Sequence, residues 1–197
     1  LADDGSVARF KFLPRLDSHR LIEEFMITAN VAAAETLEKA ALPCMYRVHD
    51  QPSKEKLEAL RNVLESVGIR FARGGTPTPK RFNQILKKAA ATPHAPMVNV
   101  MVLRSQAQAE YAPENVGHFG LALVRYCHFT SPIRRYADLL VHRALIAGGR
   151  LGPGGLEKNP GDFVELGEHL SMTERRAASA ERDAIDRFIA GFLSDRI

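Results

Sequence analysis

Residues 117–143 constrain the fold more than any other part of this sequence. The stretch contains an apolar run at 119–124, which predicts a strand, and it then places Ser131 and Pro132 together. Serine caps helices by accepting a hydrogen bond from free backbone N–H groups, and proline suits the first helical position because it has no N–H to satisfy. The stretch therefore predicts a strand that turns sharply into a helix reaching Arg143.

Charged side chains gather at the start of this expected helix. Arg134, Asp138 and His142 are spaced four residues apart, so they should share one helical face, with Arg135 and Arg143 nearby. Backbone donors and arginines at a helix start favour an anion, and phosphate is the natural candidate. The competing interpretation is a solvated helix start with an Arg134–Asp138 pair, worth roughly 0.2–0.5 kcal/mol. Spacing alone leaves both open, and the glycine, histidine, serine and proline that precede the arginines favour the anion site.

Helical periodicity dominates the rest of the chain and predicts an α+β fold, predominantly helical and packed on a small sheet. Long helices are expected over about 17–40 and 163–193, and shorter ones over 53–68, 80–91 and 97–106. Apolar residues at helical spacing predict the buried sides of the two long helices: Ile22, Phe25, Met26, Ala29, Ala33 and Leu37 in the first, and Leu166, Leu170, Ala177, Ala184, Phe188 and Phe192 in the second.

Strands and loops are fewer. Short strands are expected over 45–49 and 107–111, and an edge strand over 8–16. Residues 148–161 hold most of the glycine and proline of their neighbourhood, which predicts an exposed, mobile loop.

Size and composition fit one globular domain. The 197 residues are 45% hydrophobic, and a net charge of +4 argues little for nucleic acid by itself. Cys44 and Cys127 are the only cysteines and lack metal spacing, which predicts reduced thiols, a cytoplasmic location and no zinc site. We find no stretch that could span a membrane and no signal peptide. The sequence starts at Leu1 rather than Met, which suggests a fragment.

Other side chains could contribute to a site. Glu23 and Glu24 fall early in a helix, where the dipole favours negative charge, although either could accept from sugar hydroxyls or base amines. His118 lies in a glycine turn and is the histidine best suited to function, although a lone histidine is more often structural. The charged run at 174–182 is a surface helix with ion pairs, or a basic rim around a phosphate track. Walker, GxSxG and DxDD motifs are absent, and a two-metal phosphodiester site would need the last.

Several motifs occur in an order that is familiar. HFGLAL at 118–123 and HFTSPIRRY at 128–136, followed by Asp138, closely resemble the signature of the RNB catalytic domain in the ribonuclease II/ribonuclease R family. LIEEFM at 21–26, YRVHD at 46–50, LRS at 103–105 and MTERRA at 172–177 also match in order. The resemblance covers nearly the whole chain and is strongest to the bacterial ribonuclease R branch.

The resemblance implies processive 3′-to-5′ hydrolysis of single-stranded RNA to nucleoside 5′-monophosphates with Mg²⁺. The family's metal-binding aspartates precede the segment seen here, so residues 1–197 are expected to be the C-terminal part of the catalytic domain. No metal ligand is assigned within the chain, and the isolated chain is predicted to be inactive.

The same resemblance implies roles for single residues. It assigns phosphate contact and transition-state stabilisation to Arg134, and contact with the terminal nucleotide to Glu23 or Glu24. Glu181 falls in an AERD segment that carries a glutamate near the RNA end in ribonuclease II, whereas ribonuclease R departs from glutamate there. The remaining motif residues are expected to contact RNA without a defined role: His118, Ser131, Arg135 and Tyr136.

Other functions compete with this one. The chain could be a non-catalytic RNA-binding module with an RNB-like fold, or a purely structural helical domain that does not bind RNA. A role on duplex DNA is the weakest alternative, because little in the sequence is suited to reading its grooves. No oligomeric state is indicated.

Overall fold

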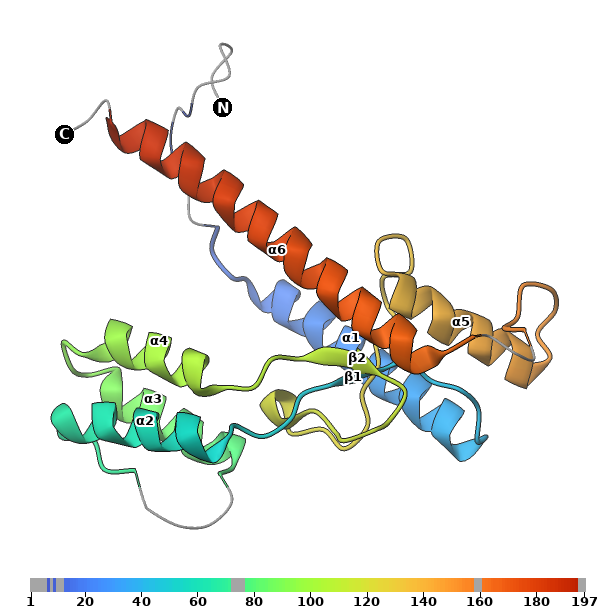
Figure 1. The fold of residues 1–197 in the computed structure, drawn as a ribbon, viewed down its shortest axis with the longest axis horizontal. Coiled ribbons are helices and arrows are strands. Elements are labelled where there is room, and N and C mark those ends of the chain that lie inside the picture. Colours follow the sequence, from blue (N-terminus) through green and yellow to red (C-terminus); the bar gives the residue numbers. More distant parts are fainter. Residues whose placement is uncertain (1–6, 8, 10–12, 72–76, 158–160, 195–197) are drawn as a thin grey trace.

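The computed structural model describes residues 7, 9, 13–71, 77–157 and 161–194 and has the expected mixed architecture (Figure 1). Helices dominate, and a two-stranded sheet lies among them, so the predicted α+β class is confirmed. The elements in chain order are α1 (Asp17–Lys39), β1 (Tyr46–Val48), α2 (Lys54–Ser66), α3 (Pro79–Ala89), α4 (Ala95–Ser105), β2 (Glu110–Ala112), the 3₁₀ turn η1 (Phe119–Leu121), α5 (Tyr136–Gly149) and α6 (Phe163–Ser194).

The sheet is small and antiparallel, and α6 lies directly against it. Arg47 of β1 is opposite Tyr111 of β2. The backbone N–H of Tyr111 donates to the Ser171 hydroxyl of α6 at 2.8 Å. A Cβ atom at Gly167 would lie 2.5 Å from the Tyr111 carbonyl oxygen, so only glycine permits this approach of helix to strand.

Helices α2, α3 and α4 form a group of their own beside the sheet (Figure 1). Ser53 begins α2 as expected, because its hydroxyl accepts from the Lys56 backbone N–H at 3.3 Å. The group encloses a separate hydrophobic core, which buries the apolar side of α2. That core includes Leu57, Leu60, Leu64, Phe82, Ile85 and Val98.

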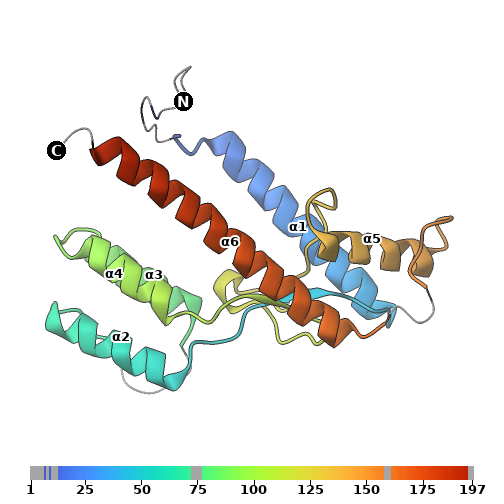
Figure 2. The ribbon, with the colours of Figure 1, turned by 45° about the horizontal axis from the view of Figure 1, so that its top comes forward.

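The two long helices are only partly covered, so the predicted burial is wrong for the outer part of each stripe. Ala33 and Leu37 are buried in the inner half of α1, whereas Phe25 in its outer half is 62% exposed. Phe188 in the outer half of α6 is likewise 49% exposed. The start of α1 and the end of α6 point toward the same end of the molecule (Figure 2), and within the described chain no element buries their apolar sides.

The central stretch also departs from its predicted form. Residues 119–124 do not form the predicted strand: 119–121 make a 3₁₀ turn, and Ala122 after it adopts a left-handed φ of 55°. Leu123 joins His118 only in an isolated bridge. The following helix begins at Tyr136, four residues later than the serine and proline predicted. Arg134 therefore precedes α5 and does not share a helical face with His142.

The predicted loop and edge strand lie partly outside the described residues. Residues 13–16 are irregular rather than β, whereas 8 and 10–12 are not described. Residues 151–154 are exposed, and residues 158–160 lie outside the description. Leu156 packs against two hydrophobic clusters other than the core of α2, α3 and α4. Its N–H donates to the Arg143 carbonyl oxygen at 2.8 Å.

Candidate phosphate-binding cleft

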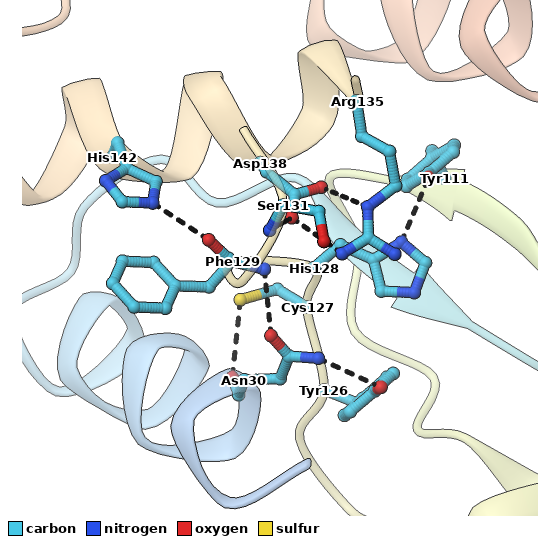
Figure 3. Close-up of polar contacts among 10 residues, drawn as sticks. All are labelled: Asn30, Tyr111, Tyr126, Cys127, His128, Phe129, Ser131, Arg135, Asp138 and His142. Atoms are coloured by element: carbon cyan, nitrogen blue, oxygen red, sulfur yellow. Dashed lines mark hydrogen bonds and ion pairs between the residues drawn. The ribbon is translucent and has the colours of Figure 1, made fainter. Parts of the chain in front are cut away.

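A fully buried carboxylate organises the turn that precedes α5 (Figure 3). One oxygen of Asp138 accepts from the Ser131 backbone N–H at 2.8 Å and from Arg135 Nη2 at 2.7 Å. Its other oxygen accepts from Arg135 Nε at 2.8 Å. This two-point contact fixes both the plane and the position of the Arg135 guanidinium. The pair expected between Arg134 and Asp138 is thus formed by Arg135 instead.

Arg134 is held by its backbone and not by its side chain. Its N–H donates to the Ser131 carbonyl oxygen at 3.3 Å, which closes the turn. The side chain is exposed, and in the described part of the chain no carboxylate pairs with its guanidinium. Two consecutive arginines therefore differ: Arg135 is committed to a buried partner, and Arg134 is free to meet an anion.

The start of α5 faces α6 across a cleft of about 530 Å³. This cleft brings together four of the residues that the sequence assigned to the site: Arg134, Arg135, Tyr136 and Glu181. Tyr136 is 48% exposed, so its ring can stack on a base or donate to a phosphate. The other lining residues are Tyr111, Ala137, Leu170, Thr173, Glu174, Ala177 and Ala178.

Tyr111 of the sheet lines the cleft, and the sequence did not assign it to the site. Arg47 lies over the Tyr111 ring at 4.7 Å and donates to Glu174 of α6 at 2.7 Å. Tyr111 Oη and His128 Nδ1 are hydrogen-bonded at 2.9 Å. Burial raises the pKa of Tyr111 to about 12. Burial, followed by the positive charges of Arg135 and Arg47, lowers the pKa of His128 to about 3, so this ring is neutral at pH 7.

His118 lies outside the cleft. Its ring stacks on His49 at 5.1 Å, and its Nδ1 accepts from the Leu121 N–H at 3.2 Å. Burial first, and then electrostatic interactions with His49 and Arg47, lower the pKa of His118 to about 4. Both histidines line a different hollow of about 430 Å³.

The other assigned residues are also absent from the cleft lining. Glu23 and Glu24 lie in the exposed half of α1, and Glu23 is paired with Arg15. Ser131 contributes its backbone N–H to Asp138 and does not line the cleft.

Asn30 anchors the segment that leads into the turn (Figure 3). Its amide nitrogen donates to Tyr126 Oη at 3.0 Å, and its amide oxygen accepts from the Phe129 N–H at 2.9 Å. Helix α5 holds the same segment, because the His142 and Phe129 rings stack at 4.2 Å and His142 Nε2 is hydrogen-bonded to the Phe129 carbonyl oxygen at 2.8 Å. Helices α1 and α5 thus both fix the approach to the cleft.

The described residues do not fit a magnesium site. They contain no group of three or more His, Cys, Asp or Glu side chains that could hold a metal ion. They also contain no helix long and apolar enough to cross a membrane.

Comparison with known proteins supports the motif resemblance. The family model for the RNB domain matches residues 1–148. The chain belongs to the RNB family. Placement of residues 1–197 as the C-terminal part of such a domain stays a prediction.

Relatives in the RNB family are similar along most of the chain. It is 44% identical to ribonuclease R of Escherichia coli K12 over 97% of its length, and 47% identical to ribonuclease R of Aquifex aeolicus over 91%. These matches cover 25% and 26% of the two relatives, so the chain spans about a quarter of their length.

Solved structures of other proteins share the fold. Mycoplasma genitalium RNase R in complex with ribose-methylated single-stranded RNA superimposes with a TM-score of 0.84 at 28% identity, covering 95% of this chain and 30% of that one. Yeast Ssd1, described as a pseudonuclease, superimposes with a TM-score of 0.63 at 26% identity, covering 81% of this chain and 20% of that one.

Proposed function

We propose that this chain forms the phosphate-binding side of an RNA-hydrolysing site. The protein would degrade single-stranded RNA from its 3′ end to nucleoside 5′-monophosphates. The observation that carries the proposal is the cleft between α5 and α6 in a chain of the RNB family, where Arg134, which has no carboxylate partner among the described residues, lies beside Tyr136. Relatives named ribonuclease R support the reaction class.

Arg134 would bind the scissile phosphate and stabilise it as the bond breaks. Negative charge on phosphate oxygens in the transition state is what a fixed guanidinium stabilises. Tyr136 and Glu181 line the same cleft and would contact the nucleotides next to that phosphate. Glu23 or Glu24 would accept from the hydroxyls of the terminal ribose, which DNA lacks at its 2′ position.

Residues outside this chain would hold the Mg²⁺ of the site. The described residues lack a suitable cluster, so we assign no metal ligand among them. The 197-residue chain alone should therefore not degrade RNA. Hydrolysis by that chain in the presence of Mg²⁺ would show that this assignment is wrong.

Single-stranded RNA is the proposed partner, and duplex DNA and membranes are not. The similar Mycoplasma genitalium RNase R has been solved with ribose-methylated single-stranded RNA and with double-stranded RNA. The free, buried thiols of Cys44 and Cys127 support a reducing compartment, and we propose the cytoplasm.

The test uses the complete polypeptide encoded by the gene, with magnesium and RNA labelled at its 5′ end. The expected result is stepwise shortening from the 3′ end with release of nucleoside 5′-monophosphates. A DNA strand of the same sequence is the matched control and should remain intact. Internal cleavage, or release of nucleotides from the 5′ end, would contradict the proposed reaction.

A second candidate is a non-catalytic RNA-binding module. The likeness to Ssd1, described as a pseudonuclease, favours keeping it. This candidate predicts salt-sensitive binding of single-stranded RNA without hydrolysis. The same assay therefore separates the two candidates.

A further inference from the structure

We propose that Asp138 is a positioning residue for Arg134 and acts through the 131–135 turn without touching RNA. The inference rests on the proposed function, because it describes how the phosphate-binding arginine is presented. It also gives Arg135 a role that differs from the RNA contact predicted for it. In this account Arg135 is mainly the partner that locks the turn.

The hydrogen bonds of Asp138 serve the turn and not the helix. Asp138 is the third residue of α5, where an acidic side chain commonly bonds back to the N-cap N–H. Here the N-cap is Arg135, and its N–H donates instead to the Ser131 carbonyl oxygen at 3.2 Å. The Asp138 carboxylate reaches past it to the Ser131 N–H and the Arg135 guanidinium.

This arrangement fixes the chain on both sides of Arg134. Ser131 lies before it and Arg135 directly after it, and both are bonded to one buried carboxylate. A buried carboxylate is costly unless it is paired and fully hydrogen-bonded, and Asp138 receives three hydrogen bonds. The backbone of Arg134 is therefore held on both sides, whereas its side chain is exposed and lines the cleft.

Arg135 is a poor direct ligand for phosphate in this geometry. Its side-on pair of donors, Nε and Nη2, already donates to Asp138, so only the end-on N–H groups of its guanidinium remain for a phosphate. The adjacent guanidinium of Arg134 has no such partner within the described chain. The structure thus divides the two arginines into one that binds and one that positions.

The main test variant is Asp138→Asn in the complete polypeptide, with single-turnover RNA hydrolysis and RNA affinity measured together. The turnover rate should fall by about 10- to 100-fold, because misplacing a reacting group by about 1 Å can cost 10²-fold. RNA affinity should change far less. Asp186→Asn, an exposed aspartate on α6, is the matched control and should leave both measurements unchanged.

A double-mutant cycle separates positioning from general stability. If Asp138 acts through Arg134, Asp138→Asn should have no further effect on turnover in an Arg134→Ala background. An equal fold-loss in both backgrounds would overturn the proposal. Arg135→Lys is a second variant in case Asp138→Asn folds poorly. It keeps the charge but loses the two-point contact with Asp138, so its loss of turnover should also disappear in an Arg134→Ala background.

Amide exchange gives a readout that needs no activity. In the Asp138→Asn variant the Ser131 N–H should exchange faster, with protection of Leu140 and Val141 in the core of α5 retained. Unchanged exchange at Ser131 would overturn the proposal. If the wild type binds RNA without hydrolysing it, the proposed reaction fails, whereas amide exchange at Ser131 still decides whether Asp138 holds the turn.

Discussion

Replacing Asn30 by alanine should destabilise the fold, because this side chain joins α1 to the segment before the turn. Asn30 is 3% exposed, and its side chain makes two hydrogen bonds to the segment before the turn. Alanine would leave the Phe129 N–H and the Tyr126 hydroxyl without this partner. Losing the bond to the Tyr126 hydroxyl should cost about 1 kcal/mol, and leaving the Phe129 N–H unsatisfied about 1–3 kcal/mol, so we expect a total loss of about 2–4 kcal/mol.

Urea unfolding of the 197-residue chain, followed by circular dichroism, measures this loss. Asn99→Ala in α4 is the matched control, because Asn99 is exposed and alanine favours helices. The control should change the free energy of unfolding by less than about 0.5 kcal/mol. If Asn30→Ala lowered that free energy by no more than the control does, the anchoring role of Asn30 would be refuted.

Two further predictions concern buried rings and a close helix contact. The rings of His118 and His128 should stay neutral down to about pH 5, because their pKa values are about 4 and 3. NMR titration measures this directly. A chemical-shift change of either ring centred near pH 6.5 would contradict the prediction. Between pH 6.5 and 4 these histidines are protonated in the unfolded chain and neutral in the folded chain, so the unfolded chain binds more protons. The free energy of unfolding should therefore fall as pH drops from 6.5 toward 4, by up to about 1.4 kcal/mol per pH unit for each ring. Gly167→Ala should destabilise the fold by about 1–3 kcal/mol, because the new Cβ would clash with Tyr111. Gly191→Ala is the control and should not destabilise it, because a Cβ there meets nothing within 4 Å. Equal melting temperatures of the two variants would refute the contact.

Local patterns predicted some elements well. The apolar spacing of Leu57, Leu60 and Leu64 and the cap at Ser53 lie within one helix, so the sequence carries the information needed to place α2. The turn before α5 could not be predicted in the same way. Its form depends on the Asp138 side chain reaching back to Ser131, which competes with the ordinary preference of serine and proline to start a helix.

The outer halves of the long helices show a different limit. Their apolar spacing correctly predicts helices, and a helix forms whether or not its apolar side is covered. Burial depends on which elements lie opposite, and periodicity does not identify them. The apolar spacing predicts that Phe25 and Phe188 are buried, but the two residues are 62% and 49% exposed.

The site was predictable only in part. The motif placed Arg134, Arg135 and Tyr136 side by side, and the structure adds Glu181 from α6 to the same cleft. The alternation of strand residues gave no sign that Tyr111 would line this cleft. That position follows from antiparallel pairing between strands about 60 residues apart and from the packing of α6, which are both long-range features.

The central claim is that Arg134 provides the phosphate-binding charge of the cleft. The direct test measures single-turnover hydrolysis of RNA with a single-stranded 3′ end. It compares the wild-type complete polypeptide with the Arg134→Ala variant. Arg134→Lys is the companion variant, which keeps the charge and loses the planar donor set. We predict a rate about 10²- to 10³-fold lower for Arg134→Ala, with RNA still bound. A rate equal to that of the wild type would contradict the account.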